Sequence, residues 1–269
     1  MHRRHFLKSS LAFTTVTAMN ITPSATPAAA AAESPETARE FYELRHYRLR
    51  RGPMGARFDD FMRDVALPAW NRAGVAPVGV FDVTLGPEMP AKYVLLAYPS
   101  LAAMAAAQTR FENDAEVRTA PFTNLPATDP GYVRKESSLL AAFQSMRKIE
   151  LPPQTAAKQP RIFELRTYES HSKSANRKKV GMFDNGEISI FRRTGLTPVF
   201  FGETLVGPRL PNLTYLLTFP DMAARERSWD AFRSDPEWKK LSATPGLTDP
   251  EIVTNIGNVL LKPTAYSQI

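Results

Sequence analysis

Two lines of Glu, Arg and Tyr are the residues of this sequence whose types and spacing best suit chemistry. They occupy alternate positions of two similar segments: Glu43, Arg45 and Tyr47, and then Glu164, Arg166 and Tyr168. Because alternate side chains of a strand point to the same face, each triplet forms one polar line. In such a line a Glu can act as a base, an Arg can hold an anion or a carbonyl oxygen, and a Tyr can donate a proton.

The two lines have two interpretations. As a functional site, they meet in one cavity and bind or polarise a small ligand. As a structural feature, each Glu–Arg pair is buried and hydrogen-bonded and sets the register of its strand, since leaving one partner alone costs about 3–5 kcal/mol. A filled interior with mutually paired Glu and Arg would therefore argue against the ligand interpretation.

The absence of cysteine and the small number of histidines exclude several other kinds of site. The 269 residues contain no cysteine, which excludes disulfides, zinc–thiolate sites, iron–sulfur clusters and cysteine nucleophiles. Beyond residue 32 the histidines are His46 and His171, and neither lies in a predicted helix or a cluster of ligands. We expect no metal ion and no cofactor, and we expect His46 to be a packed strand residue.

The charge of the chain points to no nucleic-acid partner. The formal net charge is +7, but Arg3, Arg4 and Lys8 supply three of these charges in an acid-free N-terminal segment. The remaining excess of positive charge is small, and the rest of the sequence contains no long run of Lys and Arg. Nucleic-acid binding proteins usually concentrate basic residues on one face, so we do not expect that function.

Residues 1–32 are predicted to be a twin-arginine signal peptide. The run 3–8, Arg-Arg-His-Phe-Leu-Lys, fits the twin-arginine pattern, and small residues at 28–32 suit cleavage. The weakly apolar stretch between them, 11–21, is shorter than the roughly 20 apolar residues that span a bilayer. We therefore expect cleavage within 30–32, a periplasmic or secreted protein, and no stable membrane insertion afterwards.

The rest of the chain is an internal repeat with a single offset. Residues 42–47 reappear as 163–168, and the same shift of 121 residues carries 74–78 onto 195–199 and 95–99 onto 216–220. One offset without a gap indicates a duplication. We assign domains to residues 39–148 and 161–264, joined by a Pro- and Ala-rich linker at 149–160.

Each copy is predicted to follow the order β-α-β-β-α-β of ferredoxin-like α+β folds. The expected elements are strands at 41–49, 75–85, 93–98, 132–142, 162–169 and 252–262 and helices at 58–72 and 101–112. Pro68 should bend or shorten the first helix, and Asp114 and Asp235 should cap helical turns.

The alternation along the first strand also predicts which face meets the helices. Tyr42 and Leu44 lie on one face with His46, and their counterparts Phe163 and Leu165 are apolar as well. An apolar face suits packing under helices, so the Glu-Arg-Tyr lines are expected on the face away from the helices.

These motifs resemble those of the NIPSNAP family. The resemblance rests on the Tyr-Glu-Leu-Arg-x-Tyr opening, the Gly-x-x-Pro-Val before the second strand, the Gly-Pro after it and Asp-Pro-Glu-Trp at 235–238, and it covers nearly all of 40–263. It implies a dimeric α+β barrel, in which two ferredoxin-like sheets pair with helices outside. Here the two tandem units would pair within one chain, and a homodimer of the whole chain also fits. Similar barrels serve cofactor-free monooxygenases, haem enzymes and proteins without known catalysis, so the resemblance specifies fold more than function.

Three functions follow as hypotheses. The first is a protein that binds a small, largely apolar molecule in a barrel cavity lined by the two Glu-Arg-Tyr lines. The second is a cofactor-free enzyme of the oxygenase or isomerase type that uses the same residues. The third is an interaction protein whose barrel is simply packed.

Overall fold

The computed structural model describes residues 38–269, so the predicted signal peptide lies outside the described residues. Two halves repeat one order of elements. The first half contains β1 (Phe41–Arg48), α1 (Met54–Phe61), the π-helical segment η1 (Met62–Ala66), α2 (Leu67–Arg72), β2 (Val78–Leu85), β3 (Ala91–Tyr98), α3 (Leu101–Asn113), α4 (Ala115–Thr119), the short 3-10 turn η2 (Pro121–Asn124) and β4 (Arg134–Ala142). The second contains β5 (Ile162–Glu169), α5 (Lys173–Met182), the π-helical segment η3 (Phe183–Glu187), α6 (Ile188–Arg193), β6 (Thr197–Val206), β7 (Asn212–Phe219), α7 (Met222–Ser234), α8 (Pro236–Ser242), α9 (Asp249–Ile252) and β8 (Asn255–Pro263).

The predicted strands and caps are present, but the first helix differs from the prediction. It begins at Met54 and continues through η1 to Arg72, so Pro68 does not shorten it. The second half has the same π-helical segment where Ser189 stands in place of Pro68, so the wide turn belongs to the repeat rather than to the proline. Asp114 and Asp235 each accept two backbone hydrogen bonds as N-caps, as predicted.

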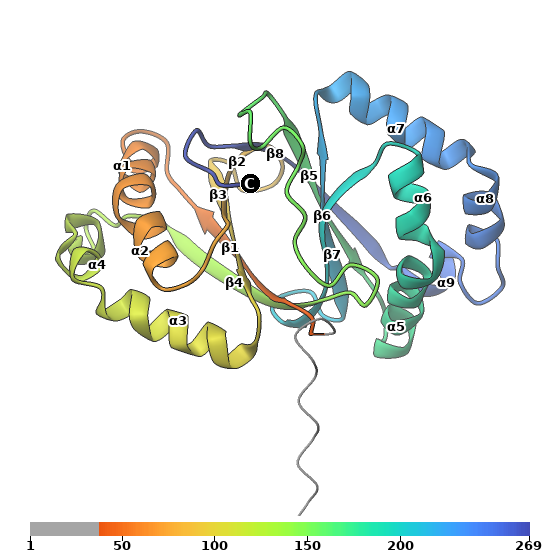
Figure 1. Cartoon of the computed structure of the whole chain (residues 1–269), viewed down its shortest axis with the longest axis horizontal. Coiled ribbons are helices and arrows are strands. Elements are labelled where there is room, and N and C mark those ends of the chain that lie inside the picture. Colours follow the sequence, from red (N-terminus) through yellow and green to blue (C-terminus); the bar gives the residue numbers. More distant parts are fainter. Residues whose placement is uncertain (1–37) are drawn as a thin grey trace, which may run out of the picture. The chain divides into compact units, whose positions relative to one another are not determined.

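The eight strands form one closed antiparallel barrel in the order β1-β3-β2-β8-β5-β7-β6-β4. Two seams join the halves: β2 pairs with β8, and β4 pairs with β6. The helices of the first half cover one side of the barrel and those of the second half cover the other (Figure 1). The two tandem units therefore form the predicted intramolecular dimeric α+β barrel.

The inside of the barrel is largely filled by apolar side chains from both halves. The buried cluster there includes Tyr42, Phe81, Leu95, Leu140, Phe163, Leu165, Phe200, Leu216 and Leu261. Since these side chains come from strands of both halves, burying them stabilises the pairing of the halves as well as each sheet.

Residues 264–269 continue beyond the predicted end of the second domain and pack against the first half. The backbone of Gln268 donates to the oxygen of Val78, and the Tyr266 hydroxyl lies 2.5 Å from the Asp59 carboxylate. Ile269 is fully buried in the barrel cluster. This segment therefore forms a third connection between the halves.

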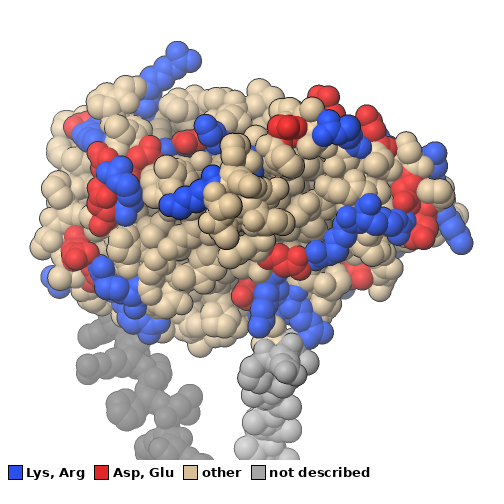
Figure 2. Space-filling model, turned by 45° about the horizontal axis from the view of Figure 1, so that its top comes forward, with Lys and Arg blue, Asp and Glu red and all other residues tan. Residues whose placement is uncertain are grey.

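The visible face of the molecule carries charges of both signs without a large patch of either (Figure 2). On the face shown in Figure 2, acidic and basic side chains alternate around an area of uncharged residues. None of the helices in residues 38–269 combines the length and the apolar composition that a membrane span requires.

Candidate functional site

The Glu-Arg-Tyr lines lie under the helices and not in the barrel lumen, so the predicted facing of the strands was wrong. Tyr47 packs in the same cluster as Phe58 of α1 and Trp70 of α2, whereas Tyr42 lies in the lumen cluster. A closed barrel with helices outside buries both faces of its strands, so an apolar face need not be the one that meets the helices. The lumen receives the apolar set, and the polar set is buried only because the helices supply hydrogen-bond partners for it.

In the first half Glu43 is saturated with hydrogen bonds. Arg45 donates to both carboxylate oxygens at 2.6 and 2.8 Å. Tyr98 and Gln108 donate to one oxygen, and Ser137 donates to the other at 2.8 Å. Burial alone would raise the pKa of the Glu43 carboxyl, but the hydrogen bonds from Arg45 and Ser137 hold that pKa below its usual value. Glu43 is therefore a fixed anion rather than a base.

In the second half Glu164 has the same role with other partners. Its carboxylate accepts from Arg225 at 2.8 and 2.5 Å, from Trp229 at 2.7 Å and from Asn258 at 2.7 Å, and it also pairs with Arg166. Its pKa is lowered, since these donors outweigh the effect of burial. Trp229 and Asn258 stand at the positions of Gln108 and Ser137, so the repeat keeps the geometry while the donors change.

These partners were missed from the sequence because they lie on other elements. The repeat could have pointed to two of these positions, because both copies have a hydrogen-bond donor there. The shift of 121 residues aligns Gln108 with Trp229 and Ser137 with Asn258. Arg225 corresponds to Met104 and left no such trace.

A cavity of about 220 Å³ lies between the sheet and the helices of the first half. We call it the helix-side cavity. Its walls are mostly apolar and aromatic, and its lining includes Phe58, Phe61, Met62, Ala66, Trp70, Phe111, Val117 and Phe122. The ring of Trp70 is stacked on that of Phe111 with their centroids 4.0 Å apart.

One side of the helix-side cavity is polar and cationic. Arg45, Tyr47, Tyr132 and Lys135 reach it from the strands and the segment before β4. The Arg45 guanidinium lies 4.9 Å from the centroid of Trp70 and stays bound to Glu43. Burial lowers the pKa of Lys135, and the nearby Arg45 lowers it further. The arrangement suits an apolar ring system that carries an oxygen or a negative charge at one end.

The corresponding region of the second half has different chemistry. Arg166, Tyr168, Arg225, Trp229 and Trp238 border an open cleft there. Trp238 occupies the position of Val117 in the repeat. Deeper in, the second half carries a buried ion pair of Lys179 and Glu187, 3.3 Å apart, at the positions of Phe58 and Ala66.

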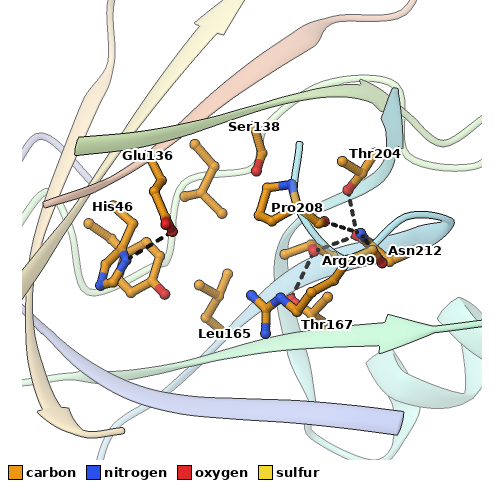
Figure 3. Close-up of a pocket in the computed structure, with 12 residues that line it drawn as sticks. His46, Glu136, Ser138, Leu165, Thr167, Thr204, Pro208, Arg209 and Asn212 are labelled. Carbon is orange, nitrogen blue, oxygen red and sulfur yellow. Dashed lines mark hydrogen bonds and ion pairs between the residues drawn. The ribbon is translucent and has the colours of Figure 1, made fainter. Parts of the chain in front are cut away.

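The lumen retains a small polar pocket of about 50 Å³ at one end, which we call the mouth pocket. Figure 3 shows His46 and Glu136 on one side of it and Arg209 with Thr167 on the other. His46 stacks on Tyr93 with a centroid distance of 4.6 Å, which agrees with a packed strand histidine. Among residues 38–269, no group of three or more His, Cys, Asp or Glu could hold a metal ion.

The filled lumen and the paired Glu and Arg argue against a ligand held inside the barrel by the two lines. The helix-side cavity is where Arg45 and Tyr47 can still meet a ligand.

Comparison with known proteins decides the family. The NIPSNAP sequence profile matches residues 42–143 and again residues 163–268. The chain belongs to the NIPSNAP family. Each half of this NIPSNAP chain is thus one copy of the family's domain, as the internal repeat predicted. No curated protein matches the sequence.

Solved structures share the fold of this NIPSNAP chain at low sequence identity. A candidate monooxygenase from Lactobacillus acidophilus NCFM is 7% identical with a TM-score of 0.54, and the match covers 84% of this chain and 94% of that one. An anthrone oxidase-like protein is 10% identical with a TM-score of 0.51, over 86% and 94% of the two chains. An uncharacterized NIPSNAP-like domain protein from Burkholderia xenovorans is 22% identical over 40% of this chain and 88% of its own, with a TM-score of 0.36. The two similarities with TM-scores above 0.5 support the barrel fold alone.

Proposed function

We propose that the protein binds a small, largely apolar molecule of one or two rings in the helix-side cavity of its first half. The observation that carries the proposal is a cavity of about 220 Å³ with aromatic walls and a cationic side. That volume exceeds the roughly 150 Å³ in which a buried apolar cavity binds benzene. It is below the range of about 300 Å³ and more that is typical of drug-sized ligands.

The polar side of the cavity defines how such a ligand would lie. Its rings would pack between Trp70 and Phe122, and a carboxylate, phenolate or carbonyl oxygen would face Arg45 and Lys135. Arg45 is held in place by Glu43 before any ligand arrives, so little conformational freedom of that side chain is lost on binding.

A cofactor-free oxygenase or isomerase is the second candidate function, and one observation favours it. Chemistry of that type needs a base. Glu43 does not serve as one, because its carboxylate is already ionised and fully hydrogen-bonded. Lys135 borders the cavity with a lowered pKa, so its amine loses a proton more readily than an ordinary lysine does. A turnover that is lost in Lys135→Met while ligand binding persists would support this candidate.

The binding proposal is tested by filling the cavity with a side chain that this fold already accepts. Val117→Trp places at position 117 the residue that stands at the equivalent position 238. Native mass spectrometry of residues 33–269, purified from the periplasm of the source cell, should show a bound small molecule, and Val117→Trp should remove it.

The matched control is Trp238→Val, which changes the same position in the other half and should leave the bound mass in place. A bare polypeptide mass from the source cell, together with no affinity for aromatic carboxylates in calorimetry, would refute the proposal. Equal loss of ligand in both variants would place the site elsewhere.

We also propose that the protein is exported through its twin arginines. The support is the run 3–8 followed by a short apolar stretch and an alanine-rich segment. Arg3→Lys combined with Arg4→Lys should leave the full-length precursor in the cytoplasm, as seen by cell fractionation and the mass of the chain. Export of that double variant at an unchanged rate would contradict this route.

A further inference from the structure

The mouth pocket exists because the two halves have diverged where they face each other. On the side of the first half it is lined by His46, Tyr93 and Glu136. The equivalent positions of the second half hold Thr167, Thr214 and Gly257, which are all smaller. The smaller side chains leave space in the otherwise filled lumen.

Arg209 reaches into that space from the hairpin between β6 and β7. Its Nη1 lies 3.5 Å from where a Cβ on Gly257 would stand, so the guanidinium packs against the backbone of β8 at ordinary contact distance. Figure 3 shows the guanidinium beside Thr167 and Leu165, directed toward the middle of the pocket. Within the described part of the chain, its one ion pair is a long contact of 3.9 Å with Glu169.

The wall that carries Arg209 is fixed in place by buried polar groups. The Asn212 amide donates to the backbone oxygens of Pro208 and Arg209, both at 3.0 Å, and its side-chain oxygen accepts from Thr204 at 2.6 Å. Thr167 and Thr214 share a hydrogen bond of 3.0 Å. The backbone that carries Arg209 and the two threonine hydroxyls are therefore held in place before any ligand binds, while the Arg209 side chain is 53% exposed and accessible to a ligand.

We propose that the mouth pocket binds a small monovalent oxyanion of carboxylate size, held by the guanidinium of Arg209 and the hydroxyl of Thr167. A guanidinium with little competition from protein carboxylates is the preferred partner of a carboxylate. The volume of about 50 Å³ admits only a few non-hydrogen atoms. Glu136 on the opposite side disfavours a second negative charge on the ligand. The site is separate from the helix-side cavity, so the two proposals stand or fall independently.

His46 provides a direct readout of the bound charge. It lies 3.8 Å from Glu136, and its pKa is lowered by burial and by Arg209, while Glu136 and Glu88 raise it. An anion on Arg209 would add negative charge near the imidazole and raise its pKa, by about one unit for a charge within roughly 6 Å. Since His46 and His171 are the histidines of residues 33–269, two imidazole signals suffice, and His171 is an internal reference.

The experiment is an NMR titration of both imidazoles with sodium acetate at constant ionic strength. We expect a saturable rise of about one unit in the pKa of His46, none in that of His171, and none with acetamide, which has the same shape without the charge. Arg209→Gln and Thr167→Val should each weaken the effect. Glu88→Gln, which changes the equivalent hairpin position in the other half, should not weaken it.

The opposing outcomes are distinct. No saturable shift of His46 with acetate would overturn the proposal, and so would an equal response to acetamide, because the pocket would then bind neutral polar molecules. If Arg209→Gln does not fold, Thr167→Val decides, and unchanged acetate affinity in that variant also overturns the proposal.

Discussion

Glu43 and Glu164 show how a residue pair that resembles a catalytic set can be structural. Each carboxylate is surrounded by donors that use its acceptor positions, and each has a lowered pKa. A base needs a free lone pair and a pKa close to the working pH. The chemistry of the helix-side cavity therefore depends on what faces it, Arg45 and Lys135, and not on the acid behind them.

Replacing the buried carboxylates should lower stability in proportion to the cations that they hold. Glu164→Gln leaves Arg166 and Arg225 without their anion and should lower the free energy of unfolding by about 3–5 kcal/mol at pH 7. Glu43→Gln, which removes the ion-pair partner of one arginine, Arg45, should lower it by less. Denaturant unfolding of both variants measures the difference, and equal or negligible losses would contradict the structural role.

The same pair predicts a pH dependence. A carboxyl whose folded pKa is lowered contributes stability above its unfolded pKa of about 4.3, and this contribution is lost as the pH falls through the folded pKa. The free energy of unfolding of Glu164→Gln should therefore decrease less steeply below about pH 4.3 than that of the native chain.

Glu187 should show the opposite pH dependence. Burial raises the pKa of Glu187 to about 7, although Lys179 acts against this rise. The folded chain then holds a proton on this carboxyl between about pH 4.3 and pH 7 that the unfolded chain has released. The free energy of unfolding should consequently fall by about 1–3 kcal/mol as the pH rises from 5 to 8, relative to Glu187→Gln at each pH. A constant difference between the two chains across that range would show that Glu187 titrates elsewhere.

At the scale of the element, the helices of the two halves solve the same packing problem in two ways. The first half places Phe58 and Ala66 between helix and sheet, where the second half places Lys179 and Glu187. The ammonium of Lys179 also lies 3.2 Å from Asp249, and it lies 5.4 Å from the ring centroid of Tyr168 and 5.3 Å from that of Phe183. A buried ion pair needs such partners because its desolvation is costly.

Exchanging this ion pair for the side chains of the first half tests that account. At pH 8, where the Glu187 carboxyl is ionised, Lys179→Phe alone leaves a buried carboxylate without its cation and should lower the free energy of unfolding by about 3–5 kcal/mol. Lys179→Phe with Glu187→Ala should be close to neutral or stabilising, because apolar replacement of both partners removes the desolvation penalty. With the native chain and Glu187→Ala, these variants form a double-mutant cycle, and additive effects would show that the two residues are not coupled.

The sequence predicted elements better than faces. The alternation at 42–47 correctly indicated a strand, the offset indicated the duplication, and Asp114 and Asp235 were correctly assigned as caps. Alternation cannot show which face meets the helices when a closed barrel buries both. The helix-side cavity depends on Phe122 and Lys135, which lie outside the repeated motifs, and the mouth pocket depends on differences between the copies, which a search for similarity passes over.

At the scale of the whole molecule, one chain supplies both sheets of the closed barrel. Each half alone would expose the unpaired edges of two strands, β2 and β4 or β6 and β8, and the apolar lumen face between them. Exposed edges and apolar faces favour association. The intact chain has used these surfaces internally, so residues 33–269 should run as a monomer in light scattering, and a stable dimer would require a further interface.

Fragments divided in the linker should restore the barrel by pairing with each other. Residues 33–153 and 154–269, produced separately and mixed, should form a one-to-one complex, because both seams and residues 264–269 connect unlike halves. The mouth pocket gives a reason for this preference: two first halves would bring Tyr93, His46 and Glu136 against their own copies, where the native barrel has Thr214, Thr167 and Gly257. Native mass spectrometry of the mixture should show the mixed pair in excess over either homodimer. A statistical mixture would mean that the two halves have not become specific for each other, and that the divergence inside the lumen serves a ligand alone.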